Sequence, residues 1–269
     1  IGLVGSEMCI RDSYKALQNL TRARFFAVQN LVKEKQRFLN YLFKKYSTMA
    51  QEKVFSNTFS TSALAVYEEF DSAETLADMD LQQLTEFLIQ KGKNRFPDPE
   101  SVAKAIQKAA RSSYRLPKRI NDSVNQVLSI SISSMKALES QIKAFDKAIA
   151  AQMELIPNTL TSVNGIGPVY SAGIIAEIGD INRFPNQAAL AKHAGLVWSQ
   201  HQSGDFEVQN TRLIKSGNRY LKYYLCEAAM SLVRCDAEYS RFYHLKYKEV
   251  NKYPVSYTHL RAHETDQYL

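Results

Sequence analysis

The stretch that decides the fold is "VNGIGPVYSAGIIAEIGDINRF", from Val163 to Phe184, because it places two glycines and a proline between two apolar helical patterns. Gly165 and Gly167 can adopt positive φ angles that other residues resist, and Pro168 suits the first turn of the next helix. Apolar spacing predicts that this next helix covers Tyr170 to Ile178. The stretch therefore predicts a tight turn between two helices.

Two interpretations of this turn stay open. In a helix-hairpin-helix turn, backbone N–H groups at the head of a helix hold a nucleic-acid phosphate without reading sequence, and Asn164, Gly165 and Gly167 are then the binding residues. In the alternative, the glycines only let two packed helices approach each other. A dinucleotide-binding loop is disfavoured, since no β-rich strand precedes the glycines and no third glycine follows at the required spacing.

The composition predicts a folded, mostly helical protein. The chain has 269 residues, of which 45% are hydrophobic and 23% charged, and it contains few glycines and prolines. No apolar run approaches the roughly 20 residues that a membrane span needs. Three cysteines without a Cys-x-x-Cys pair argue against a disulfide framework or a metal site and favour a cytoplasmic location. The net charge of +7 suggests an anionic partner.

The segment from Tyr14 to Ala50 predicts a long basic amphipathic helix. It carries eight Lys or Arg residues against one Glu, while its apolar residues keep near-helical spacing. Its basic face can follow phosphates, or it can be an ordinary solvated surface. The candidate nucleic-acid-binding residues here are Arg22, Arg24, Lys33 and Arg37.

A helical insert, residues 51 to 120, separates this helix from a second long helical pattern. The insert is acidic between Glu68 and Glu86, and we interpret these acids as helix caps and exposed positions rather than as metal ligands. Asp98 can begin a helix after Pro97. From Val124 to Ile156 a near-heptad apolar stripe predicts a coiled coil, formed with the first helix, with another subunit, or with both.

Beyond the turn, cations gather around two Ser-Gly pairs. "RFPNQAALAKHAGL" predicts a short helix that ends at Gly195, and "HQSGDF" predicts a small β-hairpin. A long helix is expected to start close to Asn218 in "KSGNRYLKYYL". The candidate nucleic-acid-binding residues of this part are Lys192, Arg212, Lys215 and Arg219.

Ser203, in "HQSGDF", has two open interpretations. A serine in a turn is usually a turn residue, but nearby Arg and Lys side chains can stabilise the charge that develops when a serine attacks phosphorus. His201 is a conceivable base, although residues two apart in a strand share a face without necessarily meeting.

These observations predict a mainly α fold in two parts. Basic coiled-coil helices with their insert cover residues 14 to 156, and a compact helical domain with the helix-hairpin-helix-like turn and the small hairpin covers 157 to 253. The end segments, 1 to 13 and 254 to 269, resemble translated sequencing-adapter sequence, and we expect them to be non-native.

Four stretches closely resemble the bacterial transposases of the insertion-sequence 110 family, also labelled 116/902. They are "LTRARFFAVQNLVKEKQRFLNYLF", "SVNGIGPVYSAGIIAEIGDINRFPNQAALAKHAGL", "HQSGDF" and "KSGNRYLKYYLCEAA". The resemblance covers nearly all of Tyr14 to Val250 and is most specific in the second half. It implies a DNA recombinase that binds a structured guide RNA, and it places the nucleophilic serine at Ser203.

The resemblance also implies a ribonuclease-H-like domain whose acidic tetrad holds Mg²⁺. That domain is expected before Tyr14, so we expect no metal site in this chain and no strand cleavage by the chain alone. A homo-oligomer through the coiled coil is expected, and no membrane partner. Two alternatives stay open: a non-catalytic helix-hairpin-helix nucleic-acid-binding protein, and a coiled-coil interaction protein whose basic face serves solubility.

Overall fold

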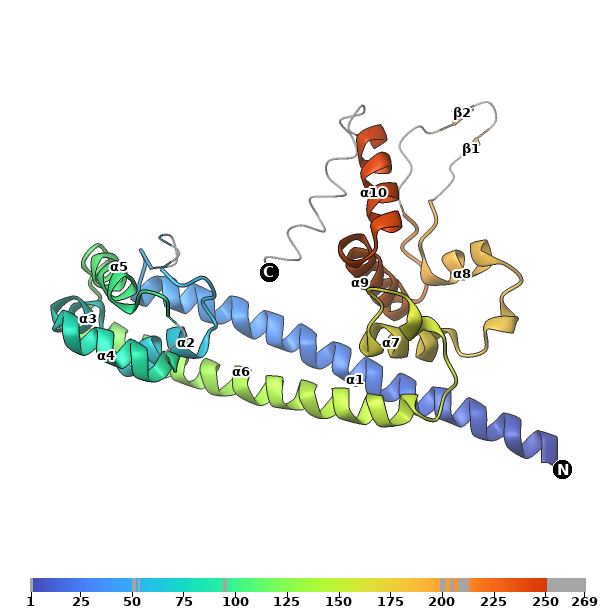
Figure 1. Cartoon of the computed structure of the whole chain (residues 1–269), viewed down its shortest axis with the longest axis horizontal. Helices are drawn as coiled ribbons and strands as arrows, with labels where there is room; N and C mark the ends of the chain where they lie inside the picture. The colour runs from blue at the N-terminus through green and yellow to red at the C-terminus, as the bar shows by residue number, and fades with distance from the viewer. Residues whose placement is uncertain are drawn as a thin grey trace. The chain divides into compact units, whose positions relative to one another are not determined.

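The structure, a computed structural model, describes residues 2–250 except 50, 51, 53, 94, 95, 199–201, 204, 205 and 208–212; for residues 2–11, 202, 203, 206, 207, 249 and 250 it describes the backbone alone. The predicted mainly α fold is confirmed (Figure 1). The helices are α1 (Gly2–Lys45), α2 (Thr61–Glu69), α3 (Ala73–Asp78), α4 (Leu81–Gly92), α5 (Pro99–Arg111), α6 (Lys118–Met153), η1 (Leu160–Ser162), α7 (Pro168–Ile178), η2 (Ile181–Arg183), α8 (Gln187–Ala194), α9 (Arg219–Cys235) and α10 (Ala237–Val250).

Short polar side chains begin many of these helices, as the sequence pattern predicts. Asp98 accepts from the Ser101 N–H at the start of α5, and Asp80 accepts from two backbone N–H groups at the start of α4. Each such bond satisfies a donor that has no partner inside the helix. Two acidic residues of the insert are therefore helix caps.

The chain divides into two compact units, one made of residues 28–140 and the other of residues 1–27 with 141–269. In the 28–140 unit, α2 to α5 gather beside the end of α1 and the start of α6 (Figure 1). One large apolar cluster fills this unit, and it includes Phe38 and Leu42 of α1 with Leu128 and Ile132 of α6. Burial of these side chains, about 1.5–3 kcal/mol each, stabilises the unit.

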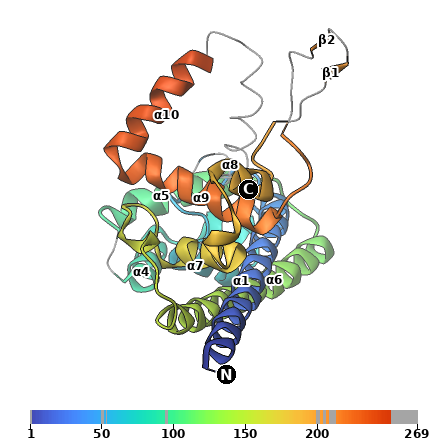
Figure 2. The ribbon, with the colours of Figure 1, turned by 90° about the vertical axis from the view of Figure 1, so that its right-hand side faces the viewer.

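The other unit has two smaller apolar clusters. Leu17 of α1 packs with Ile149 and Met153 of α6, and Ile174 of α7 packs with Leu221 and Tyr224 of α9. Figure 2 shows α7 and α9 against the blue N-terminal part of α1, and the Tyr224 hydroxyl donates to the Thr21 carbonyl at 2.9 Å. Parts of the apolar stripes of the long helices are thus buried within each unit, whereas a coiled coil in the sense of heptad packing stays a prediction.

The small β-hairpin is not established as an element of the fold. The backbones of β1 (Gln202–Ser203) and β2 (Phe206–Glu207) pair antiparallel, Gln202 with Glu207 and Ser203 with Phe206. Strands of two residues form no layer, and the residues that connect them lie outside the described part of the chain. The hairpin therefore stays a prediction.

None of the helices in the described part of the chain is both long and apolar enough to cross a bilayer.

Candidate nucleic-acid interface

The two glycines of the turn between η1 and α7 differ in backbone conformation and in the space around them. Gly165 has φ +97°, which favours glycine, and a Cβ there would lie 3.1–3.2 Å from atoms of α9. Gly167 has φ −73°, and a Cβ there would meet nothing within 4 Å. The prediction of a positive φ was therefore correct for Gly165 and wrong for Gly167, which begins α7 in an extended conformation.

The open side of this turn lies at the start of α7. Asn164 and Gly167 are exposed, and no side chain caps the N-terminus of this helix. The element before the turn is a single 3₁₀ turn, η1, because α6 already ends at Met153. The turn consequently does not join two α-helices, and the helix-hairpin-helix assignment stays a prediction.

Two more glycines meet between α8 and α9. Gly195 ends α8 with φ +73°, and Gly217 precedes α9 with φ +125°. A Cβ on Gly217 would lie 2.6 Å from the Gly195 nitrogen, and a Cβ on Gly195 would lie 2.6 Å from the Ser216 oxygen. Only glycine at both positions allows the two backbones to approach this closely without strain.

Backbone hydrogen bonds extend this contact into what we call the stem, residues 194–198 with 213–218. The Asn218 N–H donates to the His193 carbonyl at 2.7 Å, and the Ile214 N–H donates to the Val197 carbonyl at 3.0 Å. Trp198 and Leu213 form an antiparallel bridge. The stem fixes both ends of residues 199–212, the serine segment, which contains Ser203.

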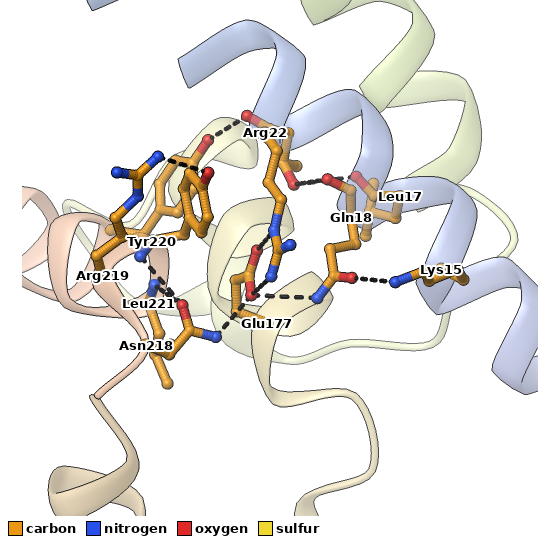
Figure 3. A network of polar contacts seen from close by, with 11 residues as sticks. Lys15, Leu17, Gln18, Arg22, Glu177, Asn218, Arg219, Tyr220 and Leu221 are labelled. Atoms are coloured by element: carbon orange, nitrogen blue, oxygen red, sulfur yellow. Dashed lines mark hydrogen bonds and ion pairs between the residues drawn. The ribbon is translucent and has the colours of Figure 1, made fainter. Parts of the chain in front are cut away.

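A buried carboxylate connects the stem to two other helices. Glu177 of α7, with no exposed side-chain area, lies among Arg22 and Gln18 of α1 and Asn218 at the start of α9 (Figure 3). Arg22 donates from Nε and Nη2 to the two carboxylate oxygens at 2.7 and 2.8 Å, Asn218 donates at 2.7 Å and Gln18 at 3.1 Å. We call these four residues the glutamate network.

Asn218 has a second role, because its side-chain oxygen accepts from the N–H groups of Tyr220 and Leu221. One amide therefore caps α9 with its oxygen and holds Glu177 with its nitrogen. This double use fixes the amide orientation, since only the NH₂ group can donate to the carboxylate.

Electrostatics favour the ionised form of Glu177. Burial alone would raise the pKa of this carboxyl, but the hydrogen bonds from Arg22, Asn218 and Gln18 and the charge of Arg22 together lower its pKa below the usual value. The hydrogen bond to Glu177 in turn raises the pKa of Arg22. The network is thus a charged pair at any pH near neutrality.

The predicted binding cations of the helical N-terminal part have different surroundings. Arg22 pairs with Glu177 and Arg24 pairs with Asp146, so both are held by carboxylates. In the 28–140 unit, Arg37 pairs with Glu34 while Lys33 is exposed. Of these four, Lys33 has the surroundings expected of a free phosphate contact.

The cations near the stem are more open. Lys192, Lys215 and Arg219 are exposed, and Arg219 begins α9 immediately after Asn218. Arg212 lies outside the described residues. Lys215 thus lies in the stem and Arg219 directly follows it, whereas a role of either in nucleic-acid binding stays a prediction.

The side chain of Ser203 lies outside the described part of the chain, and so does His201. The described backbone places Ser203 in β1, within the segment that the stem holds at both ends. His193 packs its ring against Phe184 at 5.3 Å between centroids. A role for His193 in proton transfer has no support in these contacts.

Sequence reasoning missed Glu177 and Gln18. A signal was present, because Glu177 is the one charged residue in the apolar helix "PVYSAGIIAEI", and a charge in such a place is rarely buried without a partner. The identity of its partners depends on chain segments about 155 and 41 residues away. Among the described residues, no group of three or more His, Cys, Asp or Glu side chains is arranged to hold a metal ion.

Comparison with known proteins finds a family that this region resembles. Residues 158–244 match the family described as Transposase IS116/IS110/IS902 family. The chain is 27% identical over 206 residues to the "Insertion element IS116 uncharacterized 44.8 kDa protein" of Streptomyces clavuligerus, a match that covers 73% of this chain and 48% of that protein. No solved structure shows a significant match.

Two further relatives match shorter segments. The "Probable family 20 transposase" of Pseudomonas aeruginosa is 30% identical over 105 residues, 38% of this chain and 31% of that protein. The "Transposase for insertion sequence element IS1111A" of Coxiella burnetii is 36% identical over 73 residues, 27% of this chain and 20% of that protein. The chain spans less than half the length of each of these relatives. Residues 158–244 are therefore similar to the IS116/IS110/IS902 family of transposases.

Proposed function

We propose that this chain is part of a DNA transposase whose stem and serine segment bind DNA and carry out strand exchange with Ser203 as nucleophile. The observation that carries the proposal is the contact between Gly195 and Gly217, which holds the two ends of the serine segment together. Such a contact restricts where a segment of fourteen residues, 199–212, can reach. Restriction of this kind is what a nucleophile on a loop needs in order to meet a phosphate.

The chemistry that we propose is a transesterification. The Oγ of Ser203 attacks the phosphorus of a DNA phosphodiester, and a phosphorus–Oγ bond forms while a bond from phosphorus to one DNA oxygen breaks. The serine proton ends on the leaving oxygen. The number of phosphate ester bonds is unchanged, so that a second DNA hydroxyl can reverse the step and reseal the strand without ATP.

The exposed cations at the stem support a phosphate partner. Lys192, Lys215 and Arg219 lie on segments that lead into or out of the stem. Positive charge placed there favours the additional negative charge of a pentacovalent phosphorus. It also predicts that DNA binding weakens steeply as salt concentration rises.

Further parts of the proposal rest on family resemblance. On this resemblance alone, we assign Mg²⁺ to a ribonuclease-H-like acidic domain, and no step above depends on it. A structured guide RNA and a homo-oligomer formed through the long helices are proposed partners. The chain alone is then expected not to cleave DNA.

A second candidate function has its own observation. The start of α7 is uncapped by side chains, and Asn164 and Gly167 beside it are exposed. A phosphate can be held by the N–H groups of such a helix start. In this version the chain is a non-catalytic nucleic-acid-binding protein and Ser203 is a turn residue.

The test is a covalent adduct between protein and DNA. A full-length protein that includes the acidic domain is incubated with end-labelled substrate DNA, its guide RNA and Mg²⁺, and separated under denaturing conditions. We expect a labelled protein band that Ser203→Ala abolishes. Ser216→Ala is the matched control, because Ser216 is exposed and belongs to the neighbouring Ser-Gly pair.

The controls decide between the two functions. An adduct that persists in Ser203→Ala, or that disappears in Ser216→Ala alone, would contradict the serine assignment. Normal DNA binding without any adduct would favour the non-catalytic alternative. Metal-dependent cleavage by the 269-residue chain that Ser203→Ala abolishes would refute the expectation that this chain alone is inactive.

A further inference from the structure

Four aromatic rings meet where α1 and α9 pack within one unit. Phe25 contacts Tyr220 and Tyr223 edge-to-face, with centroids 5.3 and 4.8 Å apart, and Phe26 contacts Phe25 and Tyr220 at 5.6 and 6.0 Å. Edge-to-face contacts of this kind are an ordinary way to pack two helices. Phe25, Tyr220 and Tyr223 are at least partly buried, which agrees with a packing role.

Packing between the helices does not fully account for Phe26, because 46% of its surface remains exposed. An exposed aromatic ring on a helix gains little from the contact between the helices and keeps a surface open to solvent. Its neighbour across the packed helices is a cation. The Arg219 guanidinium carbon lies 5.6 Å from the Phe26 centroid and 4.7 Å from the Tyr220 centroid.

Arg219 is oriented without a carboxylate partner among the described residues. Its Nη2 donates to the Tyr220 hydroxyl at 2.8 Å, and its side chain is exposed (Figure 3). Arg22, by contrast, lies 4.5 Å from the same Tyr220 ring but gives its charge to Glu177. Two arginines therefore flank one tyrosine, and of the two only Arg219 lacks an acidic partner within the described part of the chain.

We propose that Phe26 and Arg219 together form a stacking site for an unpaired base of single-stranded DNA. A base has an apolar face that stacks on an aromatic ring or on a guanidinium plane, and the adjoining phosphate is attracted to the arginine charge. Paired bases in a duplex cannot offer that face, because their neighbours cover it. The partner is thus a DNA strand with at least one unstacked nucleotide.

The choice of DNA rests on the proposed function. Arg219 begins α9 two residues after Gly217, and Gly217 fixes the end of the serine segment. A base bound at Phe26 and Arg219 is then part of the strand whose phosphodiester Ser203 attacks. Strand exchange requires DNA bases to leave their partners near the exchanged phosphate, and a stacking site there stabilises the unpaired nucleotide.

The experiment measures binding of the 269-residue chain to fluorescein-labelled oligothymidylate by fluorescence anisotropy, at low salt. Phe26→Ala is expected to weaken binding about tenfold, the size of one lost base–aromatic stack. Phe43→Ala is the matched control, because Phe43 lies on the same helix and is 45% exposed. A duplex of the same length is expected to bind both variants equally.

Two substitutions of Arg219 separate the effect of its charge from the effect of its planar guanidinium group. Arg219→Lys keeps the charge but loses the planar group, so it is expected to weaken oligothymidylate binding several-fold. Arg219→Ala is expected to weaken it further. Arg234→Ala, at an exposed position near the other end of α9, removes the same charge and is expected to change binding less than twofold.

A spectroscopic readout separates stacking from a loss of folding. Phe26→Trp is expected to retain binding and to lose tryptophan emission when oligothymidylate is added, relative to the unsubstituted chain with its native Trp198. Phe43→Trp is expected to show no such additional quenching. Circular dichroism of each variant verifies that the helical content is unchanged.

Several outcomes would overturn the stacking site. They are equal binding by Phe26→Ala and Phe43→Ala, an equal loss on duplex and single strand, or absent quenching in Phe26→Trp. Each would leave DNA binding and the Ser203 adduct intact. Tighter Phe26-dependent binding of oligouridylate would overturn the assignment to DNA. Absence of any DNA binding by the unsubstituted chain would reject both this site and the proposed interface, whereas loss of the adduct alone would reject only Ser203.

Discussion

The two units of the chain are stabilised in different ways. In the 28–140 unit one large apolar cluster dominates, and its buried polar groups mostly bond to backbone carbonyls, such as Lys45 to Tyr67 and Tyr46 to Phe70. In the other unit the apolar clusters are smaller, and a buried charge network and close glycine contacts fix individual segments. The first arrangement suits a scaffold, and the second suits a region where particular side chains must keep their positions.

The largest expected effect comes from the glycine contact of the stem. Gly217→Ala places a Cβ 2.6 Å from the Gly195 nitrogen at a φ of +125°, so it combines backbone strain with a backbone clash. We expect a loss of about 3 kcal/mol or more in the free energy of unfolding, measured by urea denaturation.

Gly167→Ala is the control for that measurement. It has φ −73° and open space around the added Cβ, so we expect a change within about 0.5 kcal/mol. A stable Gly217→Ala variant would mean that the stem is less rigid than its contacts indicate.

The buried carboxylate is expected to matter next. Glu177→Ala leaves Arg22, Asn218 and Gln18 without their acceptor, and we expect a loss of about 2 kcal/mol, since Arg22 keeps 36% of its side chain exposed and so regains some hydration. The partly exposed pair of Lys35 and Glu139 in the 28–140 unit is the comparison, and Glu139→Ala is expected to cost no more than about 0.5 kcal/mol.

The stabilisation that Glu177 contributes is expected to depend on pH. Because the pKa of Glu177 is lower in the folded chain than in the unfolded chain, its stabilisation is present above the unfolded value of about 4.3 and is lost as pH falls through the folded value. Glu177→Gln should therefore flatten the acid limb of the stability curve. An unchanged acid limb in that variant would show that other carboxylates set it.

In the 28–140 unit, Lys45 is expected to make the free energy of unfolding depend on pH in the alkaline range. Burial lowers the pKa of Lys45 to about 8, against the weaker effect of the Asp71 charge, which raises it. Between about pH 8 and pH 10 the unfolded chain holds more protons than the folded chain, so stability is expected to rise with pH, by about 2 kcal/mol. Above about pH 10 the raised pKa values of Tyr46 and Tyr67 reverse the trend.

Lys45→Met tests this assignment. Methionine retains much of the length of the side chain without a titrating group, so the rise in stability between pH 8 and pH 10 should disappear in denaturant titrations at each pH. A rise of the same size in Lys45→Met would assign it to another group.

The smallest expected effect compares the same helix-cap position in the two units. Asp80 caps α4 at an exposed site, so Asp80→Asn should change stability by less than about 0.5 kcal/mol. Asn218→Asp keeps the cap of α9 but turns a donor toward Glu177 into a second carboxylate, and we expect a loss of about 1 kcal/mol. Equal effects in thermal denaturation would contradict the double role of Asn218.

Much of the fold followed from local sequence. Helical periodicity and the rarity of glycine and proline predicted the mainly α class, and Asp98, Asn218 and Gly195 marked helix ends where the structure has them. These features act within a few residues along the chain, so that a single sequence is enough to find them. The first long helix was predicted to reach Ala50 and ends at Lys45, which is a larger difference than the one or two residues by which helix ends usually vary.

The candidate site was predictable only in part. "HQSGDF" and "KSGNRY" drew attention to Ser203 and to the cations around the second Ser-Gly pair, and the family match agrees with their place in the chain. The functions of Ser203, of the turn at Gly165 and of the binding cations stay predictions. Arg22 was named for its charge, whereas its neighbour in space, Glu177, shows that this charge is paired with a buried carboxylate.

By itself, the sequence determined the mainly α class, helix ends such as Asp98 and Asn218, and the position of the glycine turns, because each depends on the chemistry of neighbouring residues. The tertiary structure alone decided which of these glycines carry a close contact, which arginines keep a free charge, and which aromatic ring stays exposed. Gly167 is open while Gly217 is tightly packed, and Arg219 is exposed while Arg22 is paired. The physical reason is that burial and pairing are properties of segments far apart in the chain, which only folding brings within a few ångströms.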